Sequence, residues 1–219
     1  MTARGRFITF EGPEGSGKST QLRLLGERLR RSGLDILETQ EPGGTPIGVQ
    51  IRQVLLDAKN RELCPTAELL LMFASRAQNV DQLILPALSA GRTVLSDRFT
   101  DSTLVYQGVG RGLGSDVVYE LDRIACRGLI PDLTLIIDID AETGLARAHG
   151  RSVRTAGSET RVMETRIEDQ DLGFHRRVRE AYRQLAADES RRIRLIDGSQ
   201  TREAVQEQVW DAVDALVRS

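Results

Sequence analysis

A glycine-rich loop near the start of the chain constrains the fold more than any other part of the sequence. Residues 12–19 read Gly-Pro-Glu-Gly-Ser-Gly-Lys-Ser, which satisfies G-x-x-x-x-G-K-[ST] at every specified position. An apolar run at residues 7–10 precedes the loop, and Leu22, Leu25 and Leu29 follow it at helical spacing. The sequence therefore predicts a strand, a phosphate-binding turn and a helix in succession, which is the arrangement of a P-loop.

The rest of the chain alternates between short β-rich runs and longer stretches with helical periodicity. Strands are predicted at residues 7–10, 34–39, 93–96, 133–138 and 193–196. Helices are predicted at residues 19–31, 47–56, 67–88, 115–126, 143–149 and 202–217. This alternation predicts a three-layer α/β fold, with a five-stranded parallel sheet flanked by helices. Because no Pro/Ser-rich linker or internal repeat divides the chain, we expect a single domain over residues 1–219.

Composition excludes several classes of protein. A formal net charge of -2 argues against a broadly basic protein that binds a nucleic-acid polymer. No run approaches the ~18 apolar residues of a membrane span, and the N-terminus lacks the apolar stretch of a signal peptide. Only two cysteines occur, Cys64 and Cys126, so neither a disulfide scaffold nor a zinc site is indicated. We expect a cytoplasmic protein that binds neither nucleic-acid polymers nor membranes.

The residue types of the loop suit the phosphates of a nucleotide. Glycines allow successive backbone N–H groups to converge on phosphate oxygens, and the following helix directs its positive end at the same anion. Lys18 is expected to contact the β- and γ-phosphates, and the Ser19 hydroxyl to coordinate Mg²⁺. The predicted nucleotide-binding residues are Gly12, Pro13, Glu14, Gly15, Ser16, Gly17, Lys18, Ser19 and Thr20.

A second ligand is indicated at the carboxyl ends of the next strands. Asp97 and Arg98 end the predicted third strand, where the acid can hold Mg²⁺ or its water and the guanidinium can grip a monophosphate. Residues 41–45, Glu-Pro-Gly-Gly-Thr, follow the second strand, although alone they also suit a plain tight turn. Phe73 and Arg76 share a helix face, where a ring can stack on a base, although such a Phe can equally belong to the core.

Together these segments resemble the bacterial type of the thymidylate kinase family, which belongs to the P-loop nucleoside monophosphate kinases. Residues 10–20, 41–45, 97–98 and 106–108 occur in the family's order and approximate spacing, and the resemblance covers nearly the whole chain. It implies phosphorylation of dTMP to dTDP with ATP as the phosphoryl donor, Mg²⁺ as the cofactor, and a homodimer.

The resemblance also implies a role for each matching residue. Glu14 would meet the 3′-hydroxyl of the acceptor, and Arg98 would clamp its phosphate. Tyr106 would crowd the 2′ position of the sugar, while Gln107 and Arg76 would address the thymine edge. The implied substrate-binding residues are Glu14, Phe73, Arg76, Arg98, Ser102, Tyr106 and Gln107, with Ser19 and Asp97 as the metal-binding residues.

Two positions depart from the pattern of the family. Gln40 stands where many relatives have an arginine before the Glu-Pro-Gly-Gly stretch, so one charge of the phosphate region is missing. The aromatic residue that stacks on the base commonly lies four residues before the helix arginine, and Met72 occupies that position here. Either Phe73 stacks after a small rotation, or Met72 covers the base while Phe73 packs nearby. We expect Phe73 to stack.

An arginine-rich segment at about residues 147–166 carries little apolar material. It is either a solvated loop or a mobile lid that closes over a polyphosphate. In the family the lid supplies an arginine to the transferring phosphoryl group, and Arg147, Arg151, Arg154 and Arg161 are the candidates. Glu168, just after the lid, is expected near the acceptor or the metal. The expected catalytic residues are Lys18, Arg98, Glu14, Arg151 and Arg154.

Two other functions remain open from the sequence. A kinase acting on dUMP, UMP or CMP would differ only in the pocket around Phe73, Tyr106 and Gln107, where one methyl group changes binding by just ~1–3 kcal/mol. A P-loop regulatory switch would recognise its base through Asn-Lys-x-Asp, and this string is absent. The acidic Glu14 beside Asp97 and Arg98 also favours a kinase over a switch.

Overall fold

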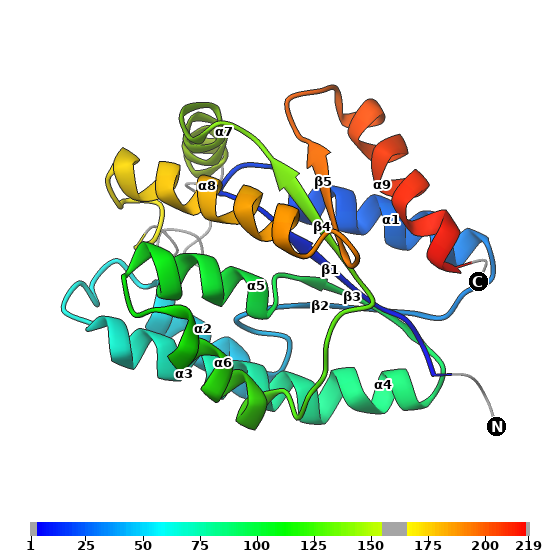
Figure 1. Ribbon diagram of the computed structural model, residues 1–219, viewed down its shortest axis with the longest axis horizontal. Helices are drawn as coiled ribbons and strands as arrows, with labels where there is room; N and C mark the ends of the chain where they lie inside the picture. The colour runs from blue at the N-terminus through cyan, green and yellow to red at the C-terminus, as the bar shows by residue number, and fades with distance from the viewer. Residues whose placement is uncertain (1–3, 155–165, 218–219) are drawn as a thin grey trace.

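The computed structural model describes residues 4–154 and 166–217. Its sheet has five parallel strands in the order β2-β3-β1-β4-β5, which confirms the predicted α/β fold (Figure 1). The strands are β1 (Phe7–Glu11), β2 (Ile36–Gln40), β3 (Thr93–Asp97), β4 (Leu133–Asp138) and β5 (Ile193–Asp197). All five predicted strands are present within two residues of the expected bounds.

Helices cover both faces of the sheet and complete the three layers (Figure 1). The helices are α1 (Lys18–Arg31), α2 (Pro46–Leu56), α3 (Pro65–Asn79), α4 (Leu85–Ser89), α5 (Thr100–Thr103), α6 (Ser115–Ala125), α7 (Ala141–Arg154), α8 (Leu172–Asp188) and α9 (Arg202–Val217), with π-helical segments η1 (Val80–Ile84) and η2 (Leu104–Gly110). Helices α1 and α9 pack on one face, where Ile8 and Phe10 of β1 meet Leu22, Leu25 and Leu29 of α1. Among the described residues, no helix is long and apolar enough to cross a membrane.

The helix predicted over residues 67–88 is divided into α3, η1 and α4. Pro86 is the physical reason, because proline has no N–H donor and its ring clashes with the carbonyl four residues earlier. The chain widens into a π-turn just before it, and the N–H of Leu85 donates to the carbonyl of Val80, five residues back. Helix α8 and the helical segment of α5 and η2 were not predicted.

The direction and order of the strands place the functional residues. The strands end in polar residues at one edge of the sheet, because all five run the same way. Strands β1 and β3 are neighbours, with Phe10 paired to Asp97, so the loop that follows β1 lies beside the residues that follow β3. The fold therefore brings the phosphate loop next to Asp97 and Arg98, as an open α/β sheet does at its carboxyl edge.

Candidate active site

The loop between β1 and α1 depends on glycine at its turns. Gly12, Gly15 and Gly17 have φ values of 131°, 69° and 99°, which side chains other than glycine rarely adopt. A Cβ on Gly15 would lie 1.9 Å from the carbonyl oxygen of Gly144, so the loop also packs too closely for a side chain there. The structure thus has the compact turn that the motif predicts.

Lys18 folds its ammonium group into this loop. Its Nζ donates to the carbonyl oxygens of Gly12 and Pro13 at 3.0 and 2.8 Å, and to Ser16 Oγ at 3.3 Å. Burial, together with the nearby positive charge of Arg98, lowers the pKa of Lys18 to about 8. A desolvated ammonium group of this kind is stabilised by an anion that enters the loop. Thr20, the last of the predicted nucleotide-binding residues, is exposed on the first turn of α1.

Ser19 and Asp97 lie together at the mouth of the loop. The Ser19 hydroxyl donates to Asp97 Oδ2 at 2.5 Å, which joins the start of α1 to the end of β3. A hydroxyl and a carboxylate are hard oxygen donors of the kind that Mg²⁺ prefers. No cluster of three or more metal-ligating His, Cys, Asp or Glu occurs within residues 4–154 and 166–217. The pair therefore fits a cation that takes its other ligands from water and phosphate.

Arg98 occupies the centre of the site in a strained backbone conformation. Its φ of 72° lies in the left-handed region, which costs a residue other than glycine about 1–3 kcal/mol. The guanidinium donates from NH2 to Glu14 Oε1 at 2.7 Å and from NH1 to the Gly12 carbonyl at 3.2 Å. Arg98 therefore faces the phosphate loop directly, which motif spacing alone could only suggest.

Glu14 and Tyr106 are hydrogen-bonded to the Arg98 guanidinium and to each other. The Tyr106 hydroxyl donates to Glu14 Oε1 at 3.0 Å and accepts from Arg98 NH2 at 3.3 Å. Burial would raise the pKa of Glu14, but the charges of Arg98 and Lys18 and the hydrogen bond from Tyr106 outweigh it and lower the pKa to about 2. Glu14 is thus an ionised carboxylate at neutral pH, between the two predicted anion sites.

Behind Arg98 lies a buried carboxylate that sequence reasoning missed. Glu11 Oε1 accepts from the backbone N–H groups of Phe99 and Ser102 at 2.7 and 3.2 Å. Its Oε2 accepts from the hydroxyls of Ser102 and Tyr182, the latter at 2.9 Å. Both hydroxyls also accept from Arg98 NH1, at 3.1 and 3.2 Å. Glu11 therefore fixes the segment after β3 to the end of β1, and Ser102 serves this network.

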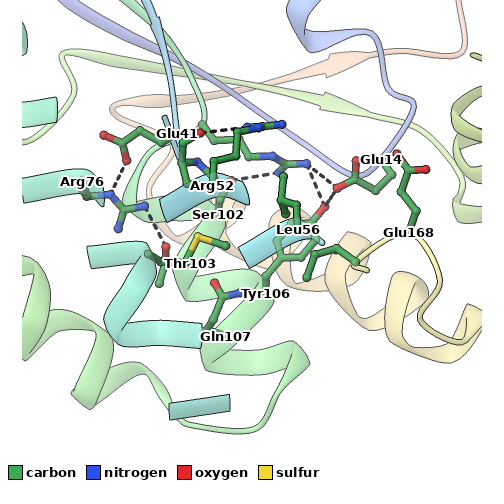
Figure 2. A pocket seen from close by; sticks show the side chains of 14 residues that line it. Glu14, Glu41, Arg52, Leu56, Arg76, Ser102, Thr103, Tyr106, Gln107 and Glu168 are labelled. Atoms are coloured by element: carbon green, nitrogen blue, oxygen red, sulfur yellow. Dashed lines mark hydrogen bonds and ion pairs between the residues drawn. The ribbon is translucent and has the colours of Figure 1, made fainter. Parts of the chain in front are cut away.

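A pocket opens beside Arg98, and six of the seven predicted substrate-binding residues line it (Figure 2). These six are Glu14, Arg76, Arg98, Ser102, Tyr106 and Gln107. Glu168, expected near the acceptor, also lines the pocket. Arg52 of α2, which belongs to none of the sequence motifs, lines it as well, and its NH1 donates to the Pro42 carbonyl at 3.0 Å.

The preference for Phe73 as the stacking residue is corrected by its position in the structure. Phe73 is 4% exposed and belongs to a core cluster with Phe7, Leu69 and Phe99. Its ring lies behind Arg76, with the ring centroid 4.8 Å from Arg76 Cζ, and does not line the pocket. Met72 lines the pocket instead. Both residues flank Arg76 on the helix surface, so spacing could not separate them, and packing against the core determines which one turns inward.

Arg76 lies in the pocket wall with much of its guanidinium bound to the protein. Nε donates to Glu41 Oε2 at 2.6 Å, and NH2 donates to the Phe99 carbonyl at 3.0 Å and to Thr103 Oγ1 at 2.9 Å (Figure 2). Both partners of the ion pair are 2% exposed. Glu41 of the predicted 41–45 motif therefore holds Arg76 in place, so the motif is more than a tight turn.

The lid prediction falls largely outside the described residues. Arg161 and the rest of residues 155–165 lie there, and Arg151 and Arg154 are described only as backbone in the last turn of α7. Arg147 donates from NH1 to the carbonyl of Gly198 at 3.2 Å, which ties α7 to the loop after β5.

The buried Glu11 makes stability depend on pH in a testable way. Burial, followed by the nearby charge of Asp101, raises the pKa of Glu11 from 4.5 to about 7. Between these values the folded chain binds more protons than the unfolded chain, so this group lowers the free energy of unfolding as pH rises from about 4.5 to 7. Over that range its contribution falls by on the order of 3 kcal/mol.

We expect Glu11→Gln to remove this contribution. Urea unfolding of the wild type and the variant at several pH values measures the difference in free energy of unfolding. The wild type should lose stability relative to the variant as pH rises through this window. A constant difference across the window would contradict the raised pKa.

The chain is similar to known proteins over most of its length. The family model described as thymidylate kinase matches residues 10–209. Thymidylate kinase from Pelobacter propionicus is 49% identical over 94% of this chain and 92% of its own length, and that from Halothermothrix orenii is 49% identical over 96% and 97%. The crystal structure of thymidylate kinase from Ehrlichia chaffeensis has a TM-score of 0.74 and 30% identity, with 96% and 99% of the two chains covered. The chain therefore belongs to the thymidylate kinase family.

Proposed function

We propose that the protein transfers the γ-phosphoryl group of ATP to dTMP, which gives ADP and dTDP. The observation that carries this proposal is the direct contact between the phosphate loop and Arg98, through the Gly12 carbonyl and the Glu14 carboxylate. Two neighbouring anion sites allow a donor and an acceptor phosphate to meet, and the approach of the two reactants accounts for much of the rate enhancement in phosphoryl transfer.

The donor binds in the loop in this proposal. The backbone N–H groups of the loop and the first turn of α1 surround the phosphates, and Lys18 places its ammonium group against them. Ser19 and Asp97 would hold Mg²⁺, because their oxygens already lie within 2.5 Å of each other at the mouth of the loop. When bound there, the ion neutralises charge on the phosphates and helps to orient them.

The acceptor binds in the pocket beside Arg98. The guanidinium of Arg98 binds the phosphate of dTMP, and Glu14 contacts the 3′-hydroxyl of the sugar. Tyr106 is 5% exposed and fills the space next to Glu14, which supports its role in excluding a 2′-hydroxyl. Met72, Arg76 and Gln107 surround the base.

The transfer proceeds in line and directly, without a covalent intermediate on the protein. The charged groups of the site, together with Arg151 or Arg154 of the lid, neutralise the charge that develops on the transferring group. Exclusion of water from the cleft suppresses hydrolysis of ATP. The chain's role is to align the two phosphates.

A panel of acceptors tests the proposed function. With ATP and Mg²⁺, a coupled assay of ADP release should respond to dTMP far more than to UMP or CMP. Lys18→Ala should lower the rate with dTMP by on the order of 10²–10³. Slow release of ADP that is the same with every acceptor would indicate a regulatory switch and contradict the kinase.

Arg98→Ala tests the acceptor clamp separately. Because its guanidinium binds the acceptor phosphate, we expect the KM for dTMP to rise by at least about tenfold, while the KM for ATP changes by less than about threefold. Arg23→Ala is the matched control, since Arg23 is exposed on α1 and pairs with Glu27. Unchanged kinetics with dTMP in Arg98→Ala would refute the clamp.

We also propose that the protein is a cytoplasmic homodimer. Support for the dimer comes from large apolar side chains that are exposed on the adjacent helices α2, α3 and α6. Val54 is 45% exposed, Leu70 51% and Ile124 68%, and large exposed apolar side chains on adjoining helices favour an interface there.

The dimer has its own test. Leu70→Glu should shift the mass measured by sedimentation from that of two chains to that of one, because a charge in an apolar interface opposes association. Leu195→Glu, at a 44% exposed position on β5, is the control and should remain dimeric. A wild-type protein with the mass of one chain at micromolar concentration would contradict the dimer.

A further inference from the structure

A buried carboxylate touches the outer side of the pocket wall without lining the pocket. Glu68 of α3 is fully buried, and its Oε1 accepts a 2.7 Å hydrogen bond from Nε2 of Gln107. Gln107 lies on η2, is 2% exposed and lines the acceptor pocket. Glu68 thus contacts, from outside the pocket, a residue that lines it.

Two arginines hold this carboxylate in place. Arg166 NH2 donates to Glu68 Oε2 at 2.6 Å, and Arg111 donates to Oε1 and Oε2 at 3.3 and 3.2 Å. Burial alone would raise the pKa of Glu68, but the hydrogen bonds from Gln107 and Arg111 and the charges of both arginines outweigh it and lower the pKa. Glu68 is therefore an ionised carboxylate, which accepts hydrogen bonds and donates none.

The hydrogen bond to Glu68 determines which end of the Gln107 amide faces the pocket. A side-chain amide can present either its NH₂ group or its oxygen to a ligand, and the two differ little in shape. Because an ionised carboxylate only accepts, the NH₂ group must turn to Glu68. Figure 2 shows the amide oxygen of Gln107 pointing up into the pocket, with its nitrogen turned aside.

We propose that Glu68 is a positioning residue that fixes the Gln107 amide with its oxygen toward the acceptor, and so selects pyrimidines that carry N3–H. This inference rests on the proposed function, because it assigns the acceptor base to this pocket. Thymine and uracil carry a hydrogen on N3 and can donate to the oxygen, whereas N3 of cytosine presents a lone pair. A polar site rejects a base that leaves its group unpaired more strongly than an apolar pocket rejects a methyl group.

Glu68→Gln is the direct test, because glutamine keeps the shape but can donate to Gln107 and release its NH₂ group to the pocket. The measured quantity is the ratio of kcat/KM for dTMP to kcat/KM for dCMP. We expect this ratio to fall by at least about tenfold. Glu62→Gln makes the same change of charge at an exposed position and should leave the ratio within about twofold.

The same change in a Gln107→Ala background separates positioning from general stability. If Glu68 acts through Gln107, Glu68→Gln should not change the ratio further once the amide is removed. An equal loss of activity with both acceptors would leave the ratio constant and overturn the proposal. So would a fall in the ratio that persists in the Gln107→Ala background.

Two further measurements test the proposal if Glu68→Gln does not fold. Glu68→Asp keeps the charge that Arg111 and Arg166 need but draws the carboxylate away from Gln107, so the ratio should again fall. The wild type should use N3-methyl-dTMP at least about tenfold less well than dTMP. Equal use of N3-methyl-dTMP and dTMP would overturn the proposal, whereas failure of the wild type to phosphorylate dTMP would instead overturn the proposed function.

Discussion

The ion pair between Arg98 and Glu14 is the interaction on which the geometry of the site depends. It joins the residue after β3 to the loop after β1 at 2.7 Å, and it exists because these two strands are neighbours in the sheet. Arg98 makes this contact with its backbone at a φ of 72°, in the left-handed region. That strained position is retained because several contacts oppose its relaxation, which is the usual arrangement at a functional site.

A buried network supports this ion pair from behind. Glu11 ends β1 and accepts four hydrogen bonds, from Phe99, Ser102 and Tyr182. Because Tyr182 belongs to α8, the network connects the sheet, the segment after β3 and a helix that is distant in sequence. Glu68 does the equivalent for Gln107, another residue that lines the pocket. In both cases an ionisable group outside the pocket orients a group inside it.

The sequence predicted the parts of the site that motifs encode locally. The phosphate loop and Arg98 follow buried strands and Asp97 ends one, so the direction of those strands was enough to place them at one edge of the sheet. Met72 and Phe73 could not be separated, because adjacent helix positions both flank Arg76 and only tertiary packing distinguishes them. The place of Ser102 shortly after β3 likewise could not reveal that its hydroxyl donates a hydrogen bond to Glu11.

Helix α8 was missed although its signals are present in the sequence. Asp171 caps it by accepting from the N–H of Phe174, and Phe174, Val178, Tyr182 and Ala186 recur at intervals of four. Recognising this helix would have predicted its buried face. It would not have predicted that Tyr182 reaches Arg98, since that contact depends on how α8 packs against β4.

In the proposed function, one cleft aligns two anions, with the Lys18 loop on one side and Arg98 on the other. A crystal structure with a bisubstrate ligand, adenosine joined to thymidine through a chain of phosphates, tests it most directly. The thymidine end should lie beside Gln107, with phosphate oxygens within about 3.5 Å of both Lys18 Nζ and the Arg98 guanidinium. A thymidine end bound elsewhere, or phosphates that contact Lys18 but not Arg98, would show that the two anions are not aligned in this cleft.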